Sequence, residues 1–281
     1  MPWACVGRPL STRSAPSRPS EETVETLYLL GEQNRIVGIS GYCVRPPEAR
    51  RDKPRVSAFT SANVSKILDL RPDIVLSFSD LQAEIVAALI RRGVAVHAFN
   101  QRTIPEIFDM IRLLGALVGA ADRAQRLADE LEAGIADSRR RAKQLQHRPL
   151  IYFEEWDEPM ISGIAWVSEL IEAAGGTDIF ADRAEGKSAK ERIVTAAEII
   201  ARQPEIIIGS WCGKKFRPEK VATRPGFGEI PAVRNGALYE IKSPLILQPG
   251  PAALTDGLKA LQGIIERAGQ NTATISVAGY G

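Results

Sequence analysis

A repeated pattern in the two halves of the chain constrains the fold more than any other feature. Lys66–Ser79 reads KILDLRPDIVLSFS, and Glu198–Trp211 reads EIIARQPEIIIGSW. Each copy has the end of an amphipathic helix, a polar turn with proline then an acid, a strand, and a polar or aromatic residue after it. A weaker pair, Glu25–Gly31 and Glu169–Gly175, repeats a helix stopped by glycine. The pattern predicts two similar lobes in tandem; chance similarity of generic βα units is the alternative.

Six short apolar runs alternate with helical stretches. Continuous runs of this kind, rich in β-branched residues, are typical of parallel sheets covered on both faces. The predicted fold class is therefore α/β, with two parallel-sheet α/β lobes joined by a single long helix and a ligand cleft between the lobes. The expected strands are Arg35–Ser40, Asp73–Ser79, Val94–Asn100, Leu150–Trp156, Glu205–Trp211 and Leu238–Ser243.

One helical pattern, Ala121–Gln146, lies between the two predicted lobes. It carries a narrow apolar stripe on a charged rod, and at 1.5 Å per residue it would be roughly 39 Å long. We interpret it as a rigid connection between lobes. The expected organisation is a disordered or atypical tail at 1–20, an N-terminal lobe at 21–120, a connecting helix at 121–147, a C-terminal lobe at 148–269 and a tail at 270–281.

Composition excludes several classes of protein. Lys and Arg number 36 against 34 for Asp and Glu, so no net field favours nucleic acid. Three widely spaced cysteines suit neither a disulfide framework nor a zinc site. No apolar run approaches the roughly 20 residues that cross a bilayer. The first residues show no secretory signal, so we expect a cytoplasmic protein as given, or a periplasmic one if the N-terminus is misread.

Aromatic and acidic residues follow the predicted strands in both halves. Ligands of open parallel sheets bind beyond the carboxyl ends of the strands, and flat rings there suit a large, rigid, partly apolar ligand. No histidine lies near the acidic segment that begins at Glu154, so a catalytic base is unsupported and we predict a binding protein rather than an enzyme. The candidate ligand-binding residues are Tyr42, Phe59, Phe78, Asp80, Glu154, Trp156, Asp157 and Trp211, with no catalytic residue and no metal ligand.

The chain resembles the helical-backbone class of ABC-importer substrate-binding proteins, in its cobalamin-binding branch. The resemblance is carried by RIVGISGYCVRPPEA, NVSKILDLRPDIVLSF, the helical pattern at 121–146, WVSELIEAAGGTDIF and VTAAEIIARQPEIII. It implies two α/β lobes joined by one helix, with cobalamin held between them as ligand. It also implies that Tyr42, Phe59 and Phe78 face the corrinoid, and that Trp156 and Trp211 occupy comparable positions in the second lobe.

Three departures from this family bear on the partner. The usual export signal and first strand are replaced by Ser11–Ser20, and the acidic segment after Phe153 is unusual. Ser65 and Ala197 occupy the positions where the family carries the acids that dock on an ABC permease, with Glu198 next to the second. These departures point to a cytoplasmic relative that binds a corrinoid without feeding a transporter, although a permease remains a possible partner. We expect a monomer.

Other ligands and classes stay open. Ferric siderophore or haem binding needs cations at the site, for which Arg45, Lys187, Lys214 and Lys215 are the candidates. A cytoplasmic two-lobe enzyme acting at a domain interface is disfavoured by the absent base. A metal-cluster paralogue would use Cys43 and Cys212, which both follow predicted strands, but buried free thiols are the simpler interpretation.

Overall fold

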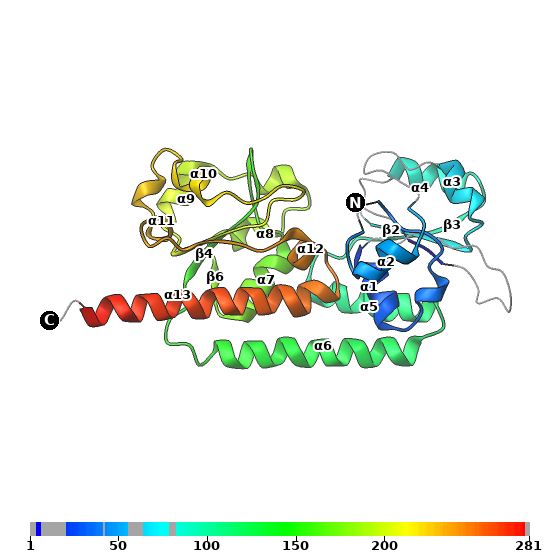
Figure 1. The fold of residues 1–281 in the computed structure, drawn as a ribbon, viewed down its shortest axis with the longest axis horizontal. Helices are drawn as coiled ribbons and strands as arrows, with labels where there is room; N and C mark the ends of the chain where they lie inside the picture. Colours follow the sequence, from blue (N-terminus) through cyan, green and yellow to red (C-terminus); the bar gives the residue numbers. More distant parts are fainter. Residues whose placement is uncertain (1–3, 7–20, 42, 56–63, 79–82, 279–281) are drawn as a thin grey trace. The chain divides into compact units, whose positions relative to one another are not determined.

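The structure is a computed structural model that describes the chain except for residues 1–3, 7–20, 42, 56–63, 79–82 and 279–281 (Figure 1). It divides into two compact units. Unit 1 contains Met1–Gln101, Pro105–Leu131 and Gln248–Pro251, and unit 2 contains Arg102–Ile104, Glu132–Leu247 and Ala252–Gly281. Two short segments, Arg102–Ile104 and Gln248–Pro251, thus belong to the opposite unit from the residues on either side of them.

Unit 1 contains a three-stranded sheet in the order β1-β2-β3. β2 (Ile74–Phe78) and β3 (Ala95–Phe99) are parallel and are connected through helix α4 (Ala83–Ile90), as the sequence predicts. β1 (Ala4–Val6) pairs antiparallel with β2, so part of the segment expected to be a tail forms a strand. The remaining helices of unit 1 are α1 (Glu21–Leu29), η1 (Gln33–Arg35), α2 (Pro47–Asp52), α3 (Val64–Asp69), α5 (Ile104–Leu117) and the first part of α6 (Ala121–Ala142).

The strand predicted at Arg35–Ser40 is wrong. A 3₁₀ turn ends at Arg35, and Ile39 makes only an isolated parallel bridge with Arg55. The Ile39 amide donates to the carbonyl of Pro54 in this bridge, and Ile36 is the other bridge position of the run, so its described residues pair at single positions and not in a continuous ladder. The apolar run is nevertheless core, since Ile36 and Ile39 are buried.

Unit 2 contains a five-stranded sheet in the order β5-β4-β7-β8, with β6 paired to β4. β4 is parallel to β6 and β7, and β7 is parallel to β8, whereas β5 returns antiparallel to β4. The parallel sheet predicted for the second half is therefore present. The strands are β4 (Leu150–Asp157), β5 (Met160–Ser162), β6 (Thr177–Asp178), β7 (Ile206–Gly209) and β8 (Leu238–Glu240).

Helices pack around this sheet, and α13 (Leu258–Ala278) runs beside α7 (Ala165–Ala174) within unit 2 (Figure 1). The core contains Tyr152, Phe180 and Phe216 together with the isoleucines of β7. The other helical segments of unit 2 are α8 (Ala181–Ala184), η3 (Ala189–Arg192), α9 (Ala196–Ala201), α10 (Pro218–Ala222), η4 (Phe227–Glu229), α11 (Pro231–Arg234), α12 (Ser243–Ile246) and η5 (Ala253–Gly257).

Helix α6 is the long helix that the sequence predicts, although it ends at Ala142 rather than at Gln146. Its 22 residues correspond to about 33 Å. In unit 2 the Ser138 hydroxyl donates to the Ala173 carbonyl at 2.6 Å and accepts from the Gln262 side chain at 2.8 Å. These buried bonds fix the C-terminal half of α6 against α7 and α13.

The repeat seen in the sequence extends to backbone conformation. Arg71 and Gln203, each preceding the proline of its copy, are the non-glycine residues with positive φ among the described residues, at 47° and 44°. Ile67 and Ile199, at matching positions of α3 and α9, are both fully buried. The two copies therefore share the same helix–turn–strand geometry. In the described part of the chain, no helix has both the length and the apolar character needed to span a membrane.

Candidate functional site

The candidate site lies at the carboxyl ends of β4 and β7 in unit 2. The strands are parallel neighbours, with Glu154 opposite Gly209. The residues that follow Glu154 and those that follow Gly209 therefore emerge at the same edge of the sheet, where ligands of α/β proteins bind. Four of the predicted site residues lie here: Glu154, Trp156, Asp157 and Trp211.

Glu154 is fully buried and all its bonding capacity is used inside the protein. Its carboxylate accepts from the Trp211 indole at 2.9 Å, from the Tyr152 hydroxyl at 3.1 Å and from Arg224 at 2.5 and 3.0 Å. Burial, and then the Glu154 charge and hydrogen bond, raise the pKa of Tyr152 well above its ordinary value. The bidentate pair with Arg224 neutralises the buried carboxylate, so Glu154 braces the strand ends instead of facing a ligand.

Asp157 is buried beneath two lysines. Its carboxylate accepts from Lys214 and, at 2.8 Å, from Lys220, and its own side chain is only 1% exposed. Burial acts to raise the pKa of this carboxyl, but the hydrogen bonds and charges of Lys214 and Lys220 outweigh it and hold the pKa below its usual range. Asp157 is therefore ionised and anchors both ammonium groups.

Of the two tryptophans predicted for the site, Trp156 and Trp211, Trp156 is the one whose ring is accessible. Its indole is half-buried, and its Nε1 donates to the Glu158 carbonyl at 2.9 Å, which fixes the ring. The Lys214 ammonium lies 3.9 Å from the ring centroid, a cation–π contact. A register shift in the β4–β5 pairing falls between Glu154 and Trp156. This shift interrupts the usual alternation and lets one lysine reach both Trp156 and Asp157.

Trp211 belongs to the core. It is 4% exposed and packs edge-on against Phe216, with ring centroids 5.0 Å apart. Phe216 in turn covers Gly209, where a Cβ would meet the phenyl ring at 1.9 Å. The absence of a side chain at Gly209 is thus what allows Phe216 and Trp211 to support the edge of the sheet.

One of the four predicted site residues of unit 1 lies among the described residues. Phe78 is buried in β2, with 2% exposure, while Tyr42, Phe59 and Asp80 lie outside the described residues. Helix α1 contributes buried acids, of which Glu21 accepts from the Val44 amide at 2.9 Å. Burial is the largest cause that raises the pKa of Glu21 to about 7.

Cys43 and Cys212 differ in their exposure. Cys43 is buried, and burial raises the pKa of its thiol, whereas Cys212 is exposed. Across the part of the chain that the structure describes, no three His, Cys, Asp or Glu side chains are placed to hold a metal ion.

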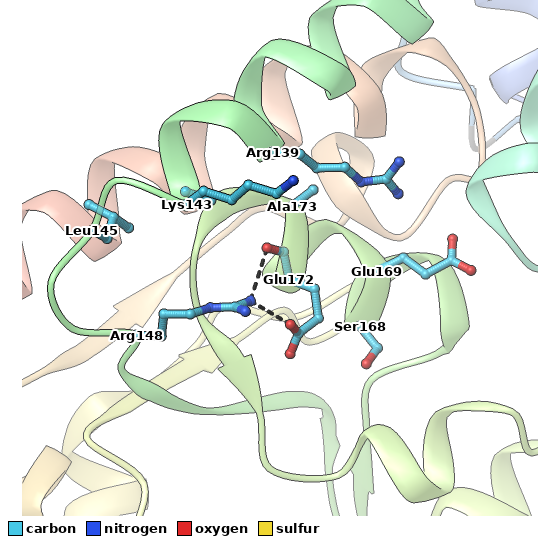
Figure 2. Close-up of a pocket in the computed structure, with 9 residues that line it drawn as sticks. Arg139, Lys143, Leu145, Arg148, Ser168, Glu169, Glu172 and Ala173 are labelled. Atoms are coloured by element: carbon cyan, nitrogen blue, oxygen red, sulfur yellow. Dashed lines mark hydrogen bonds and ion pairs between the residues drawn. The ribbon is translucent and has the colours of Figure 1, made fainter.

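A separate hollow of about 430 Å³ lies between the end of α6 and α7 in unit 2 (Figure 2). Arg148 lines this hollow. Its guanidinium donates to the Glu172 carboxylate at 2.5 Å, to the Glu172 carbonyl at 3.2 Å and to the Gly176 carbonyl at 2.8 Å. These bonds satisfy carbonyls at the end of α7, where Gly175 adopts a left-handed conformation at φ 99°. Arg148 therefore completes the helix terminus, and the hollow surrounds a structural ion pair.

Sequence reasoning missed Lys220 and Arg224, which complete the site. Both lie just after the strand exit at Trp211, four positions apart, on and after the short helix α10. Cations at i and i+4 share one face of a helical turn, so this spacing was an available signal. Lys214, which the sequence suggested only for an anionic ligand, proves to contact both Trp156 and Asp157.

Comparison with known proteins agrees with the fold. A model of the periplasmic binding protein family matches residues 20–245. The vitamin B12-binding protein of Vibrio cholerae serotype O1 is 25% identical over 234 residues, covering 82% of this chain and 81% of its own. A possible iron-binding, periplasmic solute-binding protein of Staphylococcus epidermidis has a TM-score of 0.76 at 24% identity, covering 88% of this chain and 96% of its own. The periplasmic haem-binding protein of Roseiflexus sp. RS-1 has a TM-score of 0.74 at 23% identity, with 88% and 97% covered.

The family match extends over most of the chain, and the α/β fold is that of the solved relatives. The chain belongs to the periplasmic binding protein family, the non-catalytic substrate-binding components of ABC transporters.

Proposed function

We propose that this substrate-binding protein captures cobalamin or a related corrinoid. The observation that carries the proposal is the half-buried Trp156 indole, fixed at the carboxyl end of β4 by its own bond to the Glu158 carbonyl. A flat ring held in one orientation offers contact area to a rigid macrocycle at little conformational cost. The vitamin B12-binding relatives support a corrinoid as that macrocycle.

The surroundings of Trp156 suit the polar periphery of a corrinoid. Cobalamin is rimmed by amides, which accept and donate hydrogen bonds. The ammonium groups of Lys214 and Lys220 supply donors, and the exposed carboxylate of Glu158 supplies an acceptor. An apolar platform with a polar rim is the usual composition of a small-molecule site.

A second candidate is an anionic macrocycle such as haem. The segment Lys214–Lys220 reads KKFRPEK, with four cations and one acid, and two of its lysines lie at the site. Those cations match the carboxylates of haem as well as any anionic group of a corrinoid. The fold is shared with haem-binding proteins and does not separate the two ligands.

A permease partner is consistent with the family, but docking on it would differ from the usual acid contacts. Ser65 and Ala197 are exposed and uncharged. The carboxylate of the neighbouring Glu198 accepts from the amide and the hydroxyl of the N-cap residue Thr195, each at 2.8 Å, and pairs with Arg183 at 2.5 Å. We infer that any permease contact uses other side chains.

The test is a thermal-shift and tryptophan-fluorescence titration with hydroxocobalamin, cyanocobalamin and haem. We expect saturable stabilisation by the cobalamins and roughly tenfold or greater weakening in Trp156→Ala, since loss of a buried aromatic contact costs about 1.5 kcal/mol or more. Trp156→Phe keeps a flat ring and should retain most of the affinity. Saturation by haem alone would favour the second candidate, and no shift with any of the three would refute the proposal.

A further inference from the structure

We propose that Lys214 and Lys220 form an anion subsite that binds an anionic oxygen group on the periphery of the ligand. This group is the phosphodiester of a corrinoid with a complete nucleotide loop, or a carboxylate of haem. The inference rests on the proposed function and adds the chemical group that the unit 2 edge recognises.

The first argument is the number of cations around Asp157. One carboxylate with 1% of its side chain exposed receives two ammonium groups. A single lysine is sufficient to neutralise a buried carboxylate, so the second leaves one positive charge in excess. Glu158 lies 3.9 Å from Lys220, but its side chain is 85% exposed, and its charge is largely screened by solvent.

The second argument is that the cations are both ordered and accessible. The side chains of Lys214 and Lys220 are 39% and 49% exposed, so their ammonium groups reach solvent. Lys214 lies over Trp156 and 5.4 Å from the Trp211 ring centroid, and Lys220 lies 5.9 Å from the latter. Two lysines held by a common carboxylate and by indole rings lose less freedom on binding than free surface lysines do.

The third argument is position. Lys214 contacts the same indole that we propose as the platform for the macrocycle. A ligand that stacks on the Trp156 ring or packs edge-on against it therefore brings its peripheral groups next to Lys214. Cobalamin carries one phosphodiester at its periphery, and haem carries two carboxylates, so each supplies an anionic oxygen group to an ammonium pair.

The experiment compares ligands with and without that group. Cyanocobalamin contains the phosphodiester, while dicyanocobinamide has the same corrin ring, the same net neutrality and no nucleotide loop. We expect Lys214→Gln and Lys220→Gln each to weaken cyanocobalamin binding by about five- to tenfold, as for a partly exposed charge-assisted hydrogen bond. Cobinamide binding should weaken by no more than about twofold, because its neutral amides accept weaker hydrogen bonds from these lysines than an anionic oxygen does. Haem is titrated in parallel, and the same variants should weaken it if its carboxylates occupy the subsite.

Lys259→Gln is the control, because this lysine of α13 is exposed in the same unit and makes no ion pair with Asp157 in the described structure. It should leave every affinity within twofold of wild type, and circular dichroism should show all variants folded. Equal weakening of cyanocobalamin and cobinamide, or no weakening of any ligand, overturns the anion subsite while the proposed function stands. Failure of the wild-type protein to bind any of the three ligands overturns both.

Discussion

Arg224 and Glu154, separated by 70 positions in the chain, form a bidentate ion pair in which two guanidinium nitrogens donate to the two carboxylate oxygens at 2.5 and 3.0 Å. The Glu154 side chain is fully buried and that of Arg224 is 13% exposed. The pair joins the end of β4 to the residues after α10, and the Trp211 indole donates into the same carboxylate. It is the structural support beneath the accessible residues Trp156, Lys214 and Lys220.

Arg224→Ala should lower the free energy of unfolding by about 3–5 kcal/mol, because it leaves a buried carboxylate without its counter-ion. Chemical denaturation measures this directly. Arg140→Ala removes a surface pair with Asp137, in which the arginine side chain is 69% exposed, and should cost less than about 1 kcal/mol. Similar costs for the two variants would contradict the supporting role of Arg224.

Gly209→Ala should destabilise unit 2 by about 1–3 kcal/mol, because the added methyl group would overlap the ring of Phe216. The displaced ring packs on Trp211, so the near-ultraviolet circular dichroism of the tryptophans should change as well. Gly228→Ala introduces the same group where nothing lies within 4 Å, and it should leave both signals close to wild type. An unchanged melting temperature in Gly209→Ala would show that Phe216 yields freely.

Glu21 predicts a pH dependence of stability. Burial raises its pKa from 4.5 to about 7 in the folded protein. The folded state therefore binds the proton more tightly than the unfolded state does, and stability is lost as pH rises from about 4.5 to 7. This shift of the Glu21 pKa makes the free energy of unfolding about 3 kcal/mol lower at pH 8 than it is below pH 4.5.

Glu21→Gln imitates the protonated acid and retains an oxygen for the Val44 amide. It should stabilise the protein at pH 8, with little effect at pH 4.5, as measured by urea denaturation at both values. The exposed Glu130→Gln on α6 serves as control and should not change the slope of stability with pH. A Glu21→Gln variant that is destabilised at pH 8 would show that the ionised carboxylate is needed.

Arg71→Gly should stabilise unit 1 by up to about 1 kcal/mol, because Arg71 is exposed and its φ of 47° carries a steric cost for any residue with a Cβ. Arg92→Gly makes the same substitution at an exposed turn position without positive φ. There it relieves no strain and only raises the conformational entropy of the unfolded chain, so it should destabilise the protein. Thermal melts of the two variants would shift in opposite directions. Equal shifts would contradict the strain at Arg71.

Much of the fold could be read from local sequence. The β2 and β7 strands, the long helix α6 and the glycine stop after α7 follow from apolar periodicity, charge and turn residues. The strand expected at Arg35–Ser40 could not be excluded from its own composition, because its failure depends on the chain opposite it. Among the described residues the run pairs only at the single positions Ile36 and Ile39, and Ile39 bridges Arg55.

The site was only partly predictable. Its location at the strand ends follows from the rule for parallel sheets, and Trp156 and Asp157 were found in that way. The sequence could not show that Glu154 and Trp211 are buried, because this depends on Arg224 and Phe216, which approach from later in the chain. Nor could it reveal the register shift that directs Trp156 and Asp157 toward the same lysine.

Corrinoid capture is tested most directly by isothermal titration calorimetry of the intact chain with cyanocobalamin. The account predicts one ligand per chain with a dissociation constant of about 1 μM or below, equivalent to about −8 kcal/mol. Absence of heat and of any absorbance change at about 100 μM cyanocobalamin would contradict it, because affinity would then be weaker than about 10⁻⁴ M.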